Sequence, residues 1–138
     1  LDIFPTVLDY AGIKNPSLAL DGKNLSSILE GKEETLERPL FWHFPIYLQA
    51  YNVNDNENRD SLFRTRPGSV VRKGDWKLHY FFEDNDMELY NLSEDIGEKN
   101  NLSDTNIEKK AELLKILKKW WKDSNAPIPE IKNPDFIN

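Results

Sequence analysis

The sequence of 138 residues contains no cysteine and only two histidines. Within these residues, the first absence excludes a disulfide framework, a thiolate zinc site and a cysteine nucleophile. Long hydrophobic runs are lacking too: no stretch is long enough to cross a bilayer, and no charged-then-apolar leader is present. The chain begins at Leu1 and opens directly on a helical pattern, so we expect it to be part of a longer protein.

Positive charge is also in short supply. The sequence has 18 Lys and Arg residues and 24 Asp and Glu residues, and its formal net charge is −6. Such a balance does not suit a nucleic-acid backbone, which is bound by clustered basic residues. The lysines that do cluster, between residues 109 and 122, are typical of the solvated face of a helix. We therefore expect neither a nucleic-acid nor a membrane partner.

What the sequence does have is enough apolar residues, 38%, for one compact core. Four segments are rich in β-branched or aromatic residues and are bounded by turn residues, which predicts strands. The predicted strands are 40–44, 69–72, 76–82 and 88–92. Tight turns at 73–75 and 83–86 predict that the last three strands form an antiparallel meander. The polar segment 48–67 is long enough to be a functional or disordered loop.

Three helices are also predicted. Two short ones lie near the start of the chain, with Asp2 and Asn24 as caps and Gly12 and Gly31 as stops. The third runs over 105–123 and has a broad apolar stripe suited to covering a sheet. The predicted fold class is therefore α+β: an antiparallel sheet of about four strands packed on a long C-terminal helix, preceded by two short helices.

Several patterns that resemble sites have simpler structural interpretations. The acidic turn with Asp84, Asp86 and Glu88 lacks the glycine that a calcium loop needs at its sixth position, which favours a solvated turn. Three Asn-Leu-Ser strings match the glycosylation pattern, but the same string is common in turns and helix caps, and we favour that interpretation. Their asparagines are Asn24, Asn91 and Asn101.

The two histidines are treated differently. His79 lies on the mixed face of a strand beside Lys77 and is interpreted as structural. His43 lies where a predicted strand ends before the long polar segment, a place where binding residues are often found. A structural role and a ligand-facing role both stay open for His43.

The order of six segments resembles the C-terminal part of formylglycine-dependent sulfatases of the arylsulfatase type. The segments are "DIFPTVLDYAGI", "LDGKNLSSILEG", "RPLFWHF", "SVVRKGDWKLHY", "ELYNLSEDIGEKNNL" and the tryptophan-bearing terminal helix. One departure is Ile96, where many relatives have proline in a D-P-x-E turn. The resemblance implies that residues 1–36 are the helical tail of a large catalytic α/β domain and that residues 37–138 are the C-terminal subdomain.

The resemblance also implies where the chemistry lies. In the family, a Cys or Ser in a C/S-x-P-x-R motif becomes formylglycine, whose hydrate attacks the sulfate ester, while calcium holds the sulfate. The motif does not occur in these 138 residues. Formylglycine, calcium and the metal ligands are therefore expected upstream, no catalytic or metal-binding residue is assigned to this chain, and the chain alone is predicted to be inactive. Family members are commonly periplasmic, secreted or lysosomal.

The expected substrate is a sulfated small molecule or glycan, and the residues predicted to bind it are His43 and Tyr47. Two alternatives remain. A free-standing sugar-binding module would stack exposed aromatic residues such as Trp42, Tyr47 and Tyr51 on pyranose rings. A protein-interaction module would self-associate through the faces of the first two helices, at Val7, Leu8, Ile28 and Leu29.

Overall fold

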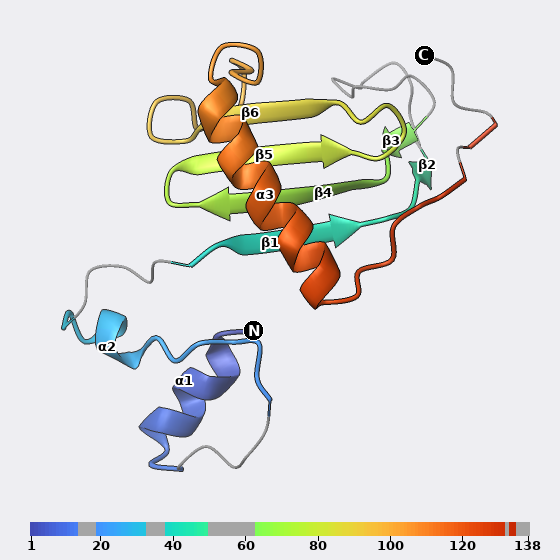
Figure 1. Ribbon diagram of the computed structural model, residues 1–138. Coiled ribbons are helices and arrows are strands. Elements are labelled where there is room, and N and C mark those ends of the chain that lie inside the picture. The colour runs from blue at the N-terminus through green and yellow to red at the C-terminus, as the bar shows by residue number, and fades with distance from the viewer. Residues whose placement is uncertain (14–18, 33–37, 50–62, 132, 135–138) are drawn as a thin grey trace. The chain divides into compact units, whose positions relative to one another are not determined.

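The computed structural model describes residues 1–13, 19–32, 38–49, 63–131 and 133–134 (Figure 1). The chain divides into two compact units, residues 1–37 and residues 38–138. Helices α1 (Ile3–Tyr10) and α2 (Ser26–Leu29) form the first unit. The second unit contains β1 (Leu40–Phe44), β2 (Leu48–Gln49), β3 (Phe63–Thr65), β4 (Gly68–Lys73), β5 (Trp76–Phe81), β6 (Met87–Asn91) and α3 (Ile107–Asp123).

The two short helices form where the sequence predicts them, but their first turns differ from the prediction. Asp2 occupies the cap position of α1 without making a side-chain cap bond, and its Oδ1 instead accepts from the backbone N–H of Lys23 at 2.9 Å. The residue at the cap of α2 is Leu25, while Asn24 accepts from the N–H of Ser26 at 2.9 Å. Both glycine stops are confirmed, since Gly12 and Gly31 have φ of +68° and +71°.

The four predicted strands form one antiparallel sheet in the order β1-β4-β5-β6. Strands β4, β5 and β6 are the predicted meander, and β1 pairs with β4 so that His43 lies opposite Ser69. Gly74 turns the chain between β4 and β5 with a φ of +59°, a conformation that costs glycine little. The prediction of one uninterrupted loop over 48–67 is wrong at both ends, where β2 and β3 pair as a second small sheet.

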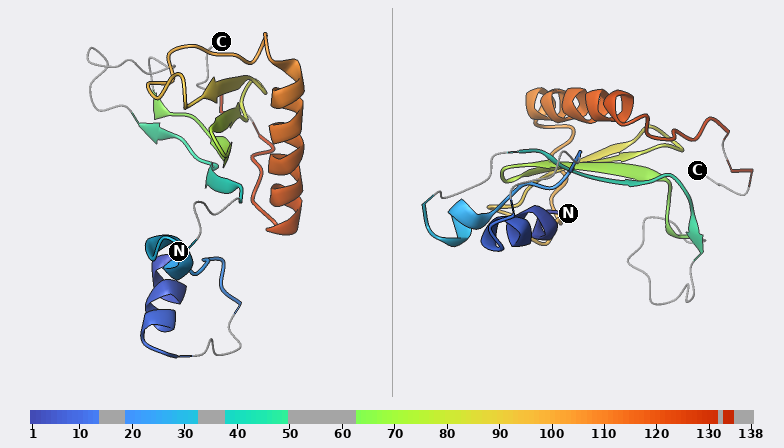
Figure 2. Two further views of the ribbon diagram at one scale, coloured as in Figure 1. Left: turned by 90° about the vertical axis from the view of Figure 1, so that its left-hand side faces the viewer. Right: turned by 90° about the horizontal axis from the view of Figure 1, so that it is seen from below.

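Helix α3 covers one face of the four-stranded sheet (Figures 1 and 2). The core between them consists of fully buried Val71, Leu78 and Leu89 from the strands and Leu113 and Leu117 from the helix. The strand alternation predicted for β5 is confirmed, because Leu78 lies in this core and Trp76 and Tyr80 pack against it. The helix begins two residues later than predicted, with Asn106 accepting from the N–H of Lys109.

The loop between β6 and α3 protects the outer edge of β6. Leu89 donates its N–H to Oδ1 of Asn101 at 3.0 Å and accepts from the N–H of Leu102 at 2.8 Å. Unpaired strand edges invite pairing with other chains, so this cover disfavours such pairing at β6. The same loop continues beside the face of the sheet opposite α3, where Glu98 reaches Lys77.

Candidate functional site

His43 lies at the end of β1 in a series of hydrogen bonds that joins three elements. Its Nε2 is 2.9 Å from the carbonyl oxygen of Pro127, which can only accept, so Nε2 carries a proton and donates. Its Nδ1 is 2.6 Å from Oγ of Ser69, which is 1% exposed. Trp121 of α3 donates its Nε1–H to the same Oγ at 2.9 Å, so the Ser69 hydroxyl is free to donate to Nδ1. Both ring nitrogens of His43 are therefore engaged within the chain.

Aromatic rings surround His43. It meets Phe82 and Trp120 edge-on, with centroid distances of 5.8 Å and 5.9 Å. Trp120 in turn stacks on Phe41 at 4.8 Å with nearly parallel rings. Together with the Ser69 contact of Trp121, these rings attach the end of α3 to β1 and β4. No local sequence signal connects Ser69 or Trp121 with His43; the pairing of β1 with β4 places Ser69 opposite it.

The second predicted site residue, Tyr47, lies in the link between β1 and β2. Its hydroxyl donates to Oε1 of Glu83, which also accepts from the backbone N–H of Asn133 at 3.2 Å. Glu83 is 4% exposed, and within the described residues its Oε2 has no hydrogen-bond partner. Because Glu83 directly follows Phe82, the structure brings His43 and Tyr47 against two consecutive residues at the end of β5. Tyr51 lies outside the described residues.

A different cluster lies on the opposite face of the sheet. Lys77 of β5 donates to Oε1 of Glu98 at 2.6 Å, and His79 contacts Oε2 of Glu98 at 2.9 Å. Burial lowers the pKa of His79, and the nearby charge of Lys77 lowers it further. Burial by itself would raise the pKa of Glu98, but the hydrogen bond and charge of Lys77, aided by His79, outweigh it and the pKa is lowered. His79 is thus held within the chain by Glu98, which agrees with a structural role, and that interpretation stays a prediction.

The three Asn-Leu-Ser strings are local turn structures, as predicted. Oδ1 of Asn91 accepts from the N–H and the hydroxyl of Ser93, at 3.3 Å and 2.8 Å. Oδ1 of Asn101 accepts from the N–H of Ser103 at 2.9 Å in addition to the β6 contact. With Asn24, each asparagine thus accepts from the backbone two residues later. In the acidic turn, Asp84 pairs with Arg66 at 2.9 Å.

The described part of the chain contains no group of three His, Asp or Glu side chains placed to hold a metal ion. The donor set of a calcium site is therefore not formed by these residues, and we assign no step through a metal to them. None of the helices in the described ranges is long and apolar enough to cross a membrane.

Comparison with known proteins identifies the family. The family described as "N-sulphoglucosamine sulphohydrolase, C-terminal" matches residues 1–125. The chain therefore belongs to this family and is the C-terminal part of a sulfatase. The predicted resemblance to sulfatases and the α+β fold are both confirmed by this match and by the solved structures that share the fold.

Three relatives illustrate the match. A sulfatase of Formosa agariphila is 34% identical over 92% of this chain and 23% of its own length. An N-acetylglucosamine-6-O-sulfatase of Bacteroides thetaiotaomicron is 29% identical over 96% of this chain and 22% of its own length. The solved structure of a 2-O GAG sulfatase has a TM-score of 0.67 at 25% identity, covering 96% of this chain and 27% of that one. The chain thus spans about a quarter of the length of its relatives.

Proposed function

We propose that this chain completes an enzyme that hydrolyses sulfate esters of a carbohydrate. The observation that supports the proposal is the family match over residues 1–125, together with relatives named as sulfatases of sugar units. In the whole enzyme, formylglycine and calcium would supply the nucleophile and the charge that holds the sulfate. Both would belong to the upstream part, so the chain alone would be inactive.

The roles that we propose differ between the two units. We propose that residues 1–36 are the tail of the catalytic α/β domain and that residues 37–138 are the C-terminal subdomain bordering the substrate cleft. This proposal is supported by the compact unit of residues 38–138, which has its own sheet, helix and core. Among the residues of the first unit that the structure describes, only Thr6 and Ser26 are buried, which suits a segment that needs a larger body.

An activity measurement tests the proposed function. An antibody raised against this chain would capture the native protein from its source cells, and sulfate release from N-acetylglucosamine 6-sulfate would be measured. We expect turnover that a calcium chelator abolishes, and no turnover by the 138-residue chain alone. A captured protein no larger than this chain, or turnover by this chain alone that a chelator abolishes, would contradict the proposal.

We further propose that His43, and with it Tyr47, contacts the group that bears the sulfate. Position favours this role, because both residues lie where the chain leaves the sheet toward segment 50–62. The observed hydrogen bonds oppose this role, because a substrate hydroxyl would have to displace the Pro127 carbonyl from Nε2 of His43 at a cost in binding free energy. Substrate binding by His43 thus stays a prediction that competes with a purely structural role.

A matched pair of variants of the whole enzyme separates the two roles. His43→Ala and Ser69→Ala both break the same hydrogen-bond series, but Ser69 is 1% exposed and cannot meet substrate. We expect both to lower the melting temperature, and His43→Ala alone to lower kcat/KM by about tenfold or more. If kcat/KM of His43→Ala stays within about twofold of the wild-type value, His43 is a structural residue only.

A further inference from the structure

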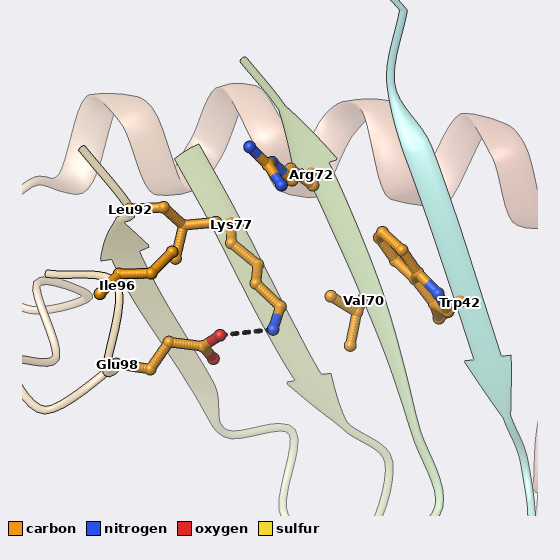
Figure 3. A pocket seen from close by; sticks show the side chains of 7 residues that line it. All are labelled: Trp42, Val70, Arg72, Lys77, Leu92, Ile96 and Glu98. Carbon is orange, nitrogen blue, oxygen red and sulfur yellow. Dashed lines mark hydrogen bonds and ion pairs between the residues drawn. The ribbon is translucent and has the colours of Figure 1, made fainter. Parts of the chain in front are cut away.

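A pocket of about 370 Å³ opens on the face of the sheet that lies away from α3 (Figure 3). Its volume falls in the range of small-molecule sites, roughly 300–1,000 Å³. Strands β1, β4 and β5 form its floor, and the loop after β6 closes one side. The side chains that line it include Trp42, Val70, Arg72, Lys77, Ile96 and Glu98.

One wall of the pocket is aromatic. Trp42 is 52% exposed, although indole is among the largest apolar surfaces a protein can bury. Strand register places Val70 directly beside Trp42, so the ring stands at the edge of an apolar floor. Across the pocket, Ile96 is 82% exposed on the loop after β6 (Figure 3). An apolar ligand face can therefore lie between two exposed apolar side chains.

Three side chains of the lining are charged. Lys77 and Glu98 form an ion pair at 2.6 Å, and their side chains are 22% and 29% exposed. The exposed Arg72 lies at the upper end in Figure 3, its Nε donating to the carbonyl of Gly74 at 3.0 Å. Since the charges of Lys77 and Glu98 offset each other, the Arg72 guanidinium leaves the lining with one net positive charge. Guanidinium groups bind sulfate and carboxylate through paired N–H donors.

We propose that this pocket binds one pyranose unit of a glycan. The C–H face of the sugar would lie against Trp42, its hydroxyls would meet the Lys77–Glu98 pair, and a sulfate or carboxylate substituent would face Arg72. The choice of a sulfated sugar rests on the proposed function; the combination of apolar and charged side chains in the lining is independent of it. A docking protein fits less well, because the centre of a protein interface is depleted of charged residues.

The test observes Trp42 directly in the 138-residue chain. The four tryptophans give four indole N–H signals in a ¹H–¹⁵N NMR spectrum, and the Trp42 signal is assigned by its loss in Trp42→Ala. The probes are N-acetylglucosamine 6-sulfate, N-acetylglucosamine and sodium sulfate. We expect saturable shifts of the Trp42 signal with both sugars, tighter binding of the sulfated one, and no saturable shift with sulfate alone.

Two variants and a control assign the contacts. Trp42→Ala should weaken binding of both sugars by about fivefold to tenfold, followed through the backbone N–H of Val70. Arg72→Gln should weaken only the sulfated sugar, by about fivefold. Phe44→Ala is the control, because Phe44 lies on the same strand face, is 40% exposed and does not line the pocket. Its binding should stay within about twofold of wild type.

Three results would overturn the proposal. Equal saturable shifts with sodium sulfate would make the pocket a simple anion site. A Trp42 signal that moves with protein concentration alone would make this face an interface between copies of the chain. Absence of any saturable shift with either sugar would exclude a saccharide site. None of these results bears on sulfate release by the native protein, so failure here is distinguishable from failure of the proposed function.

Discussion

At the scale of the residue, asparagine and histidine side chains form hydrogen bonds with other groups of the same chain. Each of the three asparagines in the Asn-Leu-Ser strings accepts from a nearby N–H, and both histidine rings are hydrogen-bonded within the chain. Partly buried polar groups that lack such partners are costly, which explains why these bonds are made. The contact of His79 with Glu98 joins two groups whose pKa values are both lowered in the folded chain.

The lowered pKa values of His79 and Glu98 predict loss of stability in acid. The unfolded chain takes up a proton on His79 near its ordinary pKa of 6.5, while the folded chain resists until a lower pH. The unfolded state therefore binds more protons, and the free energy of unfolding falls as pH decreases from about 6.5 through the lowered folded pKa. Glu98 adds a loss of the same sign below 4.5.

Urea unfolding from pH 8 to pH 4 measures this effect. We expect the wild-type midpoint to fall across this range, and the decrease between pH 7 and pH 5 to be smaller in His79→Gln, which cannot take up the proton. Glu112→Gln is the control, because the pKa of Glu112 is lowered from 4.5 to about 2 by its hydrogen bonds from Lys109 and Lys73, outside that interval. An unchanged pH profile in His79→Gln would show that this histidine does not couple folding to protons.

At the scale of the element, α3 is the helix that completes the core of the four-stranded sheet. It packs mainly on β4 and β5, and its two tryptophans reach across to β1 and β4. Its helical period alone puts Leu113 and Leu117 on one face, and both are 0% exposed. The predicted stripe is broader than the observed one, since Ile107 is 55% exposed and Ala111 is also exposed.

Shortening a buried side chain of α3 should destabilise the second unit strongly. Leu117→Ala removes three heavy atoms of a side chain that is 0% exposed, and we expect a loss of about 2–5 kcal/mol in the free energy of unfolding. Ile107→Ala on the same helix, 55% exposed, should change it by no more than about 0.5 kcal/mol. Equilibrium urea denaturation followed by circular dichroism measures both. Similar losses in the two variants would mean that α3 does not pack as described.

At the scale of the whole molecule, the two units differ in how well they bury their apolar residues. The second unit has a closed core, whereas α1 and α2 leave Val7 and Leu29 57% and 67% exposed. Exposed apolar faces of this kind are usually covered by another surface. In the proposed enzyme the catalytic domain would cover them, and in the isolated chain a second copy is the available partner.

We therefore expect the isolated chain to self-associate through its first two helices. Sedimentation velocity should show a weight-average mass that rises with concentration above 16.1 kDa. The double variant Val7→Lys with Leu29→Lys should reduce this rise, because two charges cannot be buried at low cost. Ile131→Lys, at a residue 89% exposed in the second unit, is the matched control and should leave it unchanged. A chain that stays monomeric at high concentration would contradict the expectation.

The sequence by itself determined the four strands of the main sheet, the meander and the long helix, because alternation, helical period and turn residues are local properties. The order of six segments along the chain also indicated the family. The pairing of β1 with β4, which sets Ser69 opposite His43, joins segments distant in sequence and was not predicted. The prediction for segment 48–67 and for the Asp2 cap was wrong because pairing of β2 with β3, and the Lys23 contact of Asp2, join residues distant in sequence.

Only the tertiary structure decided what the candidate residues contact. Pro127 is 84 residues from His43, and Glu98 is 21 residues from Lys77, so neither partner has a sequence signal. The pocket beside Trp42 is formed by side chains of β1, β4 and β5 together with the loop after β6, which are brought together only in the folded chain. Local patterns specify which face a side chain takes. The residues that contact the side chain on that face are set by the packing of segments that lie far apart in the chain.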